Sequence, residues 1–401
     1  NIKKLSNMKN IFIYKCIIFL ILVFFACKEE ANSPLVVGDK PDPITEYTVE
    51  SLPGGAKIVY KINSEDFLYA KVVYEILPGV KREAKSSLYR NYLTVDGFGK
   101  EDKYNVELYA VGKGEVESEP TKIEIETLTP PYITAFNNIK MNVTFGGINV
   151  EYKNEDEDNL VFNIIHIDTT NHWKHVYSHY TRFAEGNFTV RGFDTLNIKF
   201  GAYVRDRWGN ISDTLTATYK PLFESLLDYS KIKAMKLPGE VWQAHTGAPH
   251  LIIEKVWNNN TSTSDDCFHT TPNSGMPQHF SFDMGDIVKL SRFKYFQRPS
   301  TLWRAGNPKV FELWGSNNPD SNGSWDNWTK IGTFTAIKPS GLPVGTETSE
   351  DLELVRAGLD FDIPITTEPY RYYRWNTVET MANVTYISIA ELTFWGSVVK
   401  L

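Results

Sequence analysis

Short runs in which apolar and polar residues alternate make up most of the chain after residue 44. Examples are YNVELYAV at residues 104–111 and LNIKFGAYV at residues 196–204. A period of two sends one set of side chains into a core and the other set into solvent, as in an antiparallel sheet. Turns rich in Gly, Asn and Asp separate these runs. The pattern therefore predicts an all-β protein built from short antiparallel strands.

Two stretches depart from this alternation. Residues 16–26 are an unbroken apolar run, which follows a positively charged N-terminal segment with Lys3, Lys4 and Lys9 and ends directly before Cys27. The run is shorter than the about 20 residues that a transmembrane helix needs, but it has the form of a secretory signal peptide. We therefore predict a signal peptide at residues 1–26 and, because residues 27–43 are rich in Pro, Asp and Asn, a flexible tether after it. The second stretch, residues 222–237, has Leu side chains at helical spacing and predicts a helix.

An internal repeat organises the first half of the mature chain. Three landmarks recur in the same order at offsets of 92, 95 and 94 residues. They are Gly54-Gly55 with Gly146-Gly147, LTVDGF from Leu93 with FTVRGF from Phe188, and Tyr109 with Tyr203. Each copy has the strand number and turn spacing of a seven-stranded sandwich. We place the copies at residues 44–129 and 130–221, with a boundary at Thr129-Pro130-Pro131. The end of the first copy, YAVGKGEVESEP, resembles the last hairpin of fibronectin type III modules.

Composition and charge narrow the class of function. The formal net charge of −7 and the absence of a basic stripe argue against a nucleic-acid partner. Aromatic residues make up 13% of the chain, which suits both strands and contact with sugar rings. After removal of the leader only Cys27 and Cys267 remain, and we expect Cys267 to be a packed core residue.

The sequence contains no catalytic motif that we could identify. The patterns GxSxG, HExxH, the P-loop and a helix-opening GxGxxG are all absent. His172, His175 and His179 have metal-like spacing, but they fall in a predicted hairpin and are expected to face solvent. We therefore predict that the protein is not an enzyme, with a degenerate glycosidase as the enzymatic alternative.

The third region, residues 222–401, resembles F5/8 type C domains, which are discoidin-like (galactose-binding-like) jelly-roll β-sandwiches. The resemblance rests on QHFSFDMG from Gln278, a strand ending in Arg298, NPKVFELWGSNNP from Asn307 and ISIAELTFWG from Ile387. The expected fold is thus all-β, with two tandem Ig/Fn3-like sandwiches before a discoidin-like one. Trp314, Trp375 and Trp395 lie in alternating strands and are expected in its core.

In that family a structural calcium ion often lies where the loop after the first strand meets the last strand. The matching positions are Asn258, Asn260, Ser262 or Thr263, and Glu391, so the resemblance implies a possible Ca²⁺ site there. The family commonly has Asp at the position of Asn258. The alternative is a turn held by asparagine hydrogen bonds.

Sugar binding in the family uses loops at one end of the sandwich, where an aromatic face and polar side chains meet a sugar ring. The loop at residues 297–308 is expected to lie on the surface, as loops usually do. The resulting set of candidate ligand-binding residues is Trp303, Arg304, Arg298, Asn307, His269, Asp265 and Trp242. The alternative is that Trp303 caps the end of the sandwich and that Arg298 forms a structural ion pair.

Residues 24–27 resemble the lipobox of bacterial lipoproteins, with Phe24 and Phe25 in place of the usual residues and Cys27 as the lipidated position. The whole arrangement resembles surface lipoproteins of Bacteroidetes that are encoded with glycan-uptake systems. The resemblance implies an outer-membrane protein, lipid-anchored and facing the cell exterior, which binds a glycan and contributes to polysaccharide capture. The alternative is an accessory lipoprotein that binds no sugar and docks to an outer-membrane transport or surface protein.

Overall fold

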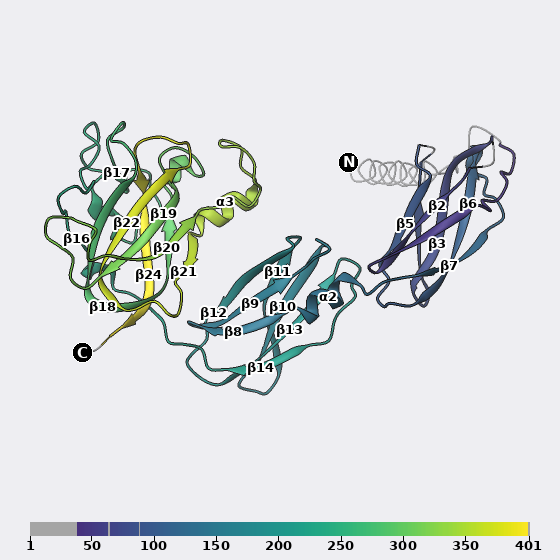
Figure 1. The fold of residues 1–401 in the computed structure, drawn as a ribbon, viewed down its shortest axis with the longest axis horizontal. Coiled ribbons are helices and arrows are strands. Elements are labelled where there is room, and N and C mark those ends of the chain that lie inside the picture. The colour runs from purple at the N-terminus through teal and green to yellow at the C-terminus, as the bar shows by residue number, and fades with distance from the viewer. Residues whose placement is uncertain (1–37, 63–64, 88, 400–401) are drawn as a thin grey trace, which may run out of the picture.

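The computed structural model describes residues 38–62, 65–87 and 89–399, which form three β-sandwiches one after another along the chain (Figure 1). The predicted signal peptide at residues 1–26 and Cys27 lie outside the described residues. Within the described ranges, no helix has the length and apolar character needed to span a membrane. Each sandwich has its own large hydrophobic core. The predicted all-β class is therefore confirmed.

The first sandwich consists of seven strands. They are β1 (Tyr47–Leu52), β2 (Gly55–Tyr60), β3 (Phe67–Leu77), β4 (Val80–Lys85), β5 (Tyr92–Asp96), β6 (Lys103–Gly112) and β7 (Thr121–Glu126), with a 3₁₀ turn, η1 (Lys113–Glu115), after β6. A three-stranded sheet in the order β1-β2-β5 packs against a four-stranded sheet in the order β4-β3-β6-β7. In β2, Ala56, Ile58 and Tyr60 are buried and the residues between them are half-exposed, as the alternation predicts.

The second sandwich repeats this plan. Its elements are α2 (Pro131–Asn137), β8 (Lys140–Thr144), β9 (Gly147–Lys153), β10 (Leu160–Ile167), β11 (Trp173–Thr181), β12 (Glu185–Arg191), β13 (Ile198–Asp206) and β14 (Leu215–Tyr219). The sheets have the orders β12-β9-β8 and β11-β10-β13-β14. The added helix α2 begins at Pro131, a position where proline costs no helical hydrogen bond, and it buries Tyr132 and Ala135 against the sheet.

The sequence repeat corresponds to a repeated hydrogen bond. In the first sandwich the Ser118 hydroxyl accepts the backbone N–H of Ala110 at 3.0 Å. In the second, the Ser212 hydroxyl accepts the backbone N–H of Val204 at 2.9 Å. The two serines are 94 residues apart in the sequence. Each fixes the turn that follows the long penultimate strand of its sandwich. The repeat in the sequence is thus a structural repeat.

The third sandwich is larger and is built around one long strand. Its elements are β15 (Ser225–Leu226), η2 (Tyr229–Lys231), β16 (Lys233–Ala234), η3 (Ile253–Trp257), β17 (Phe268–His269), β18 (Gln278–Phe296), η4 (Pro299–Thr301), β19 (Pro308–Ser316), β20 (Thr329–Thr335), α3 (Ser349–Arg356), β21 (Leu359–Asp362), β22 (Tyr370–Thr380), β23 (Ser388–Ile389) and β24 (Glu391–Val398). An eight-stranded sheet follows the order β15-β24-β18-β22-β19-β20, with β16 and β21 also paired to β18. Phe311 and Trp375 stack at 4.2 Å in its core, and both are fully buried.

The predicted helix at residues 222–237 is wrong. Leu226 pairs with Trp395 of β24, and Ala234 pairs with Phe282 of β18, so this segment forms short edge strands and one 3₁₀ turn. The neighbouring sheet offers backbone hydrogen bonds to the segment, and these outweigh its weak helical periodicity. The helix α3, by contrast, begins with a capping box in which Thr348 and Asp351 exchange hydrogen bonds.

Ion pairs join the second sandwich to the third. Arg191 of β12 contacts both Asp362 of β21 and Glu224, which precedes β15. Glu224 is also 3.3 Å from Arg292 of β18 and accepts the Ser291 hydroxyl at 2.6 Å. This network fixes the orientation of the third sandwich relative to the second.

A tryptophan joins the first sandwich to the second. Trp208, which follows β13, lies between the guanidinium groups of Arg82 and Arg207, at 4.3 Å and 4.7 Å from its ring centre. A Cβ at Gly97 would lie only 3.0 Å from this ring, so the glycine permits the close approach of the two sandwiches. Arg207 also pairs with Asp96 across the junction at 2.8 Å.

Candidate functional site

Trp303, the aromatic residue predicted to face a sugar ring, is buried. Its side chain is 1% exposed, and its ring N–H donates to the carbonyl of Asp351 in α3 at 2.9 Å. Residues 336–358, which include α3, cover the end of the sandwich where this loop lies. The prediction that Trp303 lies on a surface loop is therefore wrong, and the alternative of an end cap describes it correctly.

Asn307 is also a structural residue. It is fully buried, its side-chain oxygen accepts the backbone N–H of Arg298 at 2.9 Å, and its amide group donates to the carbonyls of Thr301 and Arg304. Every polar atom of its side chain is therefore used inside the loop. The loop in turn displays the exposed Arg304, which lies between two residues with positive φ, Trp303 and Ala305.

Arg298 and Asp265 remain partly available at this end of the sandwich. The Arg298 guanidinium donates to the carbonyl of Ser264 at 2.9 Å and lies 3.9 Å from the Asp265 carboxylate. The Asp265 side chain is 86% exposed, so this ion pair is weak. Together with Arg304, these two residues are the predicted candidates that could still contact a ligand here.

His269 and Trp242 do not belong to the candidate residues that remain available to a ligand. His269 is 8% exposed, stacks on Tyr386 at 4.8 Å and donates from Nδ1 to the Thr270 carbonyl. Burial lowers the pKa of its imidazole. Trp242 packs against the hydrophobic core and carries Lys236 over its ring at 5.2 Å. The prediction that these two side chains form an open sugar site with Trp303 is therefore wrong.

One small cavity remains beside α3. It measures about 270 Å³ and lies between the loop at Gln297 and Leu302 and the helix residues Val355 and Arg356. Gln297 is 3% exposed, and among the described residues its amide nitrogen has no hydrogen-bond partner. This volume falls below the about 300–1,000 Å³ typical of small-molecule sites, so the end of the sandwich is largely filled.

The residues predicted to hold calcium come together but present the wrong atoms. The Glu391 carboxylate accepts the backbone N–H groups of Asn258 and Asn259, at 3.1 Å and 2.9 Å. The amide groups of Asn258 and Asn260 both donate to Asp266, which also pairs with Lys255 at 2.5 Å. Calcium requires converging oxygen atoms, whereas N–H donors and an ammonium group occupy these carboxylates. The side chains as arranged do not fit Ca²⁺.

The burial of Glu391 gives a test of this arrangement. Burial raises the pKa of its carboxyl to about 8, from 4.5 in the unfolded chain. Between pH 4.5 and 8 the unfolded chain therefore binds fewer protons, and the contribution of Glu391 to stability falls as the pH rises. We expect Glu391→Gln to flatten this fall in an unfolding series across that range. EDTA and CaCl₂ should leave the wild-type transition unchanged, and a stabilisation by CaCl₂ would contradict the assignment.

A different surface of the third sandwich carries half-exposed aromatic rings. On the outer face of the sheet, Trp314 of β19 lies opposite Arg374 of β22, and Glu312 lies opposite Asn376. His279 of β18 continues the second row beside Asn376. Trp325, from the loop before β20, packs over this face at 5.0 Å from Trp314 and 4.9 Å from His279. We call Trp314, Trp325, His279, Glu312 and Asn376 the sheet-face cluster.

Arg374 holds the sheet-face cluster in place from below. Its guanidinium lies 4.4 Å and 4.3 Å from the ring centres of Trp325 and Trp328, and it is fully buried. It pairs with the equally buried Glu240 at 3.4 Å and donates to the Ser281 hydroxyl at 2.8 Å. Trp325 thus packs over a buried cation and is itself half-exposed.

The polar groups of the cluster bond mainly to one another, and Asn376 is 8% exposed. Glu312 accepts the ring N–H of Trp314 at 3.1 Å, the amide of Asn376 at 2.9 Å and the ammonium of Lys330 at 2.5 Å. Among the described residues, the side-chain oxygen of Asn376 has no partner. Burial and the nearby Arg374 lower the pKa of His279 to about 4, so its imidazole is neutral at pH 7. The cluster therefore combines half-buried ring faces with neutral and acidic hydrogen-bonding groups.

The predicted core position of Trp314 is wrong, whereas that of Trp375 is confirmed. Trp375 is fully buried, but Trp314 is half-exposed on the face that also carries Glu312. Trp395 is half-exposed as well, with Arg292 over its ring at 3.7 Å. The signal for Trp314 was present in the sequence, because residues two apart in a strand share a face and Glu312 is charged.

Two other predictions concern groups elsewhere in the chain. Cys267 is fully buried, as expected, and burial raises the pKa of its thiol to about 11. His172 lies in the turn of the predicted hairpin, His175 bonds to Ser178, and His179 packs against Phe188 at 4.4 Å. In the part of the chain that the structure describes, no group of three His, Cys, Asp or Glu side chains is arranged to hold a metal.

Comparison with known families assigns a separate family model to the main part of each sandwich. Three family models match, each described as a domain of unknown function. They are DUF4959 at residues 41–127, DUF5126 at residues 128–230 and DUF5000 at residues 257–396. No curated protein matches the chain.

Solved structures provide relatives of single domains and of larger parts of the chain. SusE-like protein BT2857 is 32% identical over 67% of this chain and 100% of its own, with a TM-score of 0.44. This sequence identity over the whole of the relative shows that the chain belongs to the same SusE-like family. The module CBM32-3 of a family 31 glycoside hydrolase from Clostridium perfringens is 19% identical over 43% of this chain and 95% of its own, with a TM-score of 0.32. The C. perfringens NanJ family 32 module in complex with galactose is 17% identical over 43% of this chain and 98% of its own, with a TM-score of 0.29. Similarity at these scores supports no statement about what this chain binds.

Proposed function

We propose that this protein is a non-enzymatic glycan-binding protein of the cell surface. In this proposal a lipid on Cys27 anchors the chain to the outer membrane, and the first two sandwiches act as a spacer. The third sandwich binds a poly- or oligosaccharide and contributes to polysaccharide capture, within or beside a glycan-uptake complex. The SusE-like relative supports this general class.

The observation that carries the proposal is the sheet-face cluster. Sugar rings bind by placing their C–H groups on aromatic faces while their hydroxyls bond to polar side chains at the edge of the ring. Trp314 and Trp325 supply two such faces, and Glu312 and Asn376 lie in the adjacent cross-strand row. Glu312 is charged, and hydrogen bonds to charged groups are stronger than those to neutral groups. Trp314, Glu312 and Asn376 lie on strands, which fix side chains more firmly than a loop would.

The test compares two surfaces of the same domain. Trp314→Ala should reduce binding of the purified full chain to its glycan on an array by tenfold or more, because it removes a stacking face. Arg304→Ala, at the filled end of the sandwich, is the matched control and should change binding less than twofold. Equal binding by Trp314→Ala and wild type would contradict the assignment to the sheet face.

The same binding experiment on whole cells tests whether Cys27 carries the lipid anchor. Cells that express Cys27→Ala should lose surface binding of the glycan, because the chain can no longer be lipidated. The purified variant should bind as well as wild type. Surface binding that persists in these cells would show that Cys27 is not the anchor.

A second candidate function is that of an accessory protein that docks to an outer-membrane transport or surface protein and binds no sugar. Large apolar side chains project around α3 and the loop before it, with exposed fractions of 72% for Ile337, 55% for Val344 and 41% for Leu354. Exposed apolar side chains gathered in one region suit a protein partner. Absence of wild-type binding to every glycan on the array would favour this function.

A further inference from the structure

A large cavity lies in the second sandwich, away from the sheet-face cluster. It measures about 720 Å³, within the range of small-molecule sites. The ends of strands β10, β11 and β13 and the turns beside them form its wall, and Pro339 and Glu350 of the third sandwich complete its rim. The nearness of α3 to the second sandwich can be followed in Figure 1.

The wall of this cavity carries two exposed aromatic rings. Tyr180 and Phe183 have exposed fractions of 70% and 72%, although both lie beside a packed sheet. Tyr180, Val161 and Arg205 form one cross-strand row on the outer face of this sheet. The turn after β11 is held by a hydrogen bond from the Phe183 backbone to the Thr181 hydroxyl at 3.1 Å. Both rings are therefore presented by ordered backbone.

Arginines surround these rings. Arg182 and Arg205 line the cavity, are exposed, and have no ion-pair partner among the described residues. Arg207 also lines it but pairs with Asp96. Asp206 lines the cavity as well, but its two oxygens accept hydrogen bonds from the Trp208 backbone and from the backbone and side chain of Asn210, and it forms no ion pair with Arg182 or Arg205. Two guanidinium groups are thus left to meet an anion.

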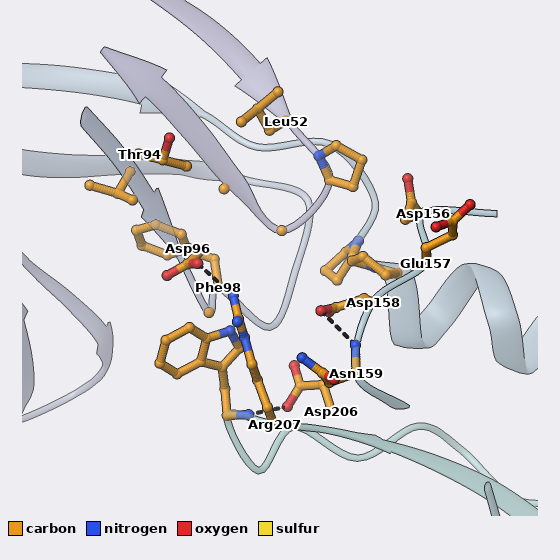
Figure 2. Close-up of a pocket in the computed structure, with 18 of the residues that line it drawn as sticks. Leu52, Thr94, Asp96, Phe98, Asp156, Glu157, Asp158, Asn159, Asp206 and Arg207 are labelled. Carbon is orange, nitrogen blue, oxygen red and sulfur yellow. Dashed lines mark hydrogen bonds and ion pairs between the residues drawn. The ribbon is translucent and has the colours of Figure 1, made fainter. Parts of the chain in front are cut away.

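A second hollow adjoins the first and has the opposite charge. This hollow measures about 400 Å³ and lies at the junction of the first two sandwiches. Figure 2 shows Asp96, Asp156, Glu157 and Asp158 around it. Arg182, Asp206, Arg207 and Trp208 line both spaces. A ligand that extends from the first hollow to the second would therefore pass the shared arginines Arg182 and Arg207 and then meet carboxylates.

We propose that the cavity in the second sandwich binds a saccharide that carries an isolated carboxylate or sulfate group. Tyr180 and Phe183 would stack on sugar rings, and Arg182 and Arg205 would pair with the anionic group in the bidentate manner that suits guanidinium. The acidic hollow would disfavour chains that are charged at every residue. This site is separate from the sheet-face cluster and does not depend on it.

The experiment measures binding of the purified full chain by calorimetry. The probes are glucuronoxylan, which bears scattered carboxylates, the same polymer after carboxyl reduction, polygalacturonate and chondroitin sulfate. We expect glucuronoxylan to bind more tightly than the reduced polymer and than the two uniformly charged chains. The double variant Arg182→Gln with Arg205→Gln and the variant Phe183→Ala should each weaken this binding by tenfold or more. Glu350→Gln, which removes a negative charge from the rim, should strengthen it.

Matched controls separate this site from others. Trp173→Ala removes another exposed aromatic residue of β11 that does not line the cavity, and it should leave binding unchanged. Trp314→Ala should also leave it unchanged, which distinguishes this site from the sheet-face cluster. The proposal is overturned by equal binding of the reduced polymer, by full binding in the cavity variants, or by failure of wild type to bind any anionic probe.

Discussion

Replacing Trp303 with alanine is expected to lower the free energy of unfolding of the third sandwich by about 3–5 kcal/mol. The side chain is almost fully buried in the main core of that domain, and its ring N–H is paired with the Asp351 carbonyl. Its removal would leave a large cavity and an unpaired carbonyl under α3. The loss therefore combines a packing term with a hydrogen-bonding term.

Hydrogen exchange across β18 in the full chain measures this effect, because that strand lies at the centre of the third sandwich. Arg304→Ala is the matched control, since its side chain is exposed next to Trp303 and surface changes usually cost less than about 0.5 kcal/mol. Protection of β18 that is unchanged in Trp303→Ala would show that the end of the sandwich is open rather than filled.

The second large effect is expected from the buried pair of Arg374 and Glu240. Both side chains are fully buried, so Glu240→Ala would leave a guanidinium without its counter-charge inside the protein. Breaking a buried pair in this way costs about 3–5 kcal/mol. Since Arg374 supports Trp325 from below, the variant should also loosen the loop before β20.

A double variant tests the electrostatic origin of this cost. Arg374→Met combined with Glu240→Leu removes both charges and keeps similar side-chain volume, so it should lose less stability than Glu240→Ala alone. Some cost will remain, because the carbonyls of Gly323 and Ser324 lose their donor. Urea unfolding, together with hydrogen exchange of the backbone amides of β22, measures the loss of stability in both variants. A double variant as unstable as the sum of the single ones would point to packing instead.

The fold could be predicted largely because the sequence repeats itself. Landmarks such as the Gly54-Gly55 and Gly146-Gly147 pairs mark the same strand in each copy, and Ser118 and Ser212 make the same hydrogen bond. Period-two alternation then identified most strands of all three sandwiches. It failed at residues 222–237, where short edge pairings with distant strands decide the structure.

The candidate site was harder to predict because burial depends on segments far apart in the sequence. Nothing near Trp303 shows that α3, nearly 50 residues later, will cover it. For Trp314, by contrast, the local sequence is informative, because Glu312 two residues away already marks the outer face of the strand. Local spacing therefore assigns a side chain to one face of a strand, while tertiary contacts decide whether that face is open.

The cover that α3 places over the end of the third sandwich has a consequence for the kind of polymer this protein could hold. An open pocket at the tip of a domain accepts the terminus of a chain or a short branch. A binding face on the flank of a sheet, like the proposed one at Trp314 and Trp325, lets a chain pass across it without an end. A surface protein built in this way could grip long polysaccharides at any point along their length, before any enzyme has cut them.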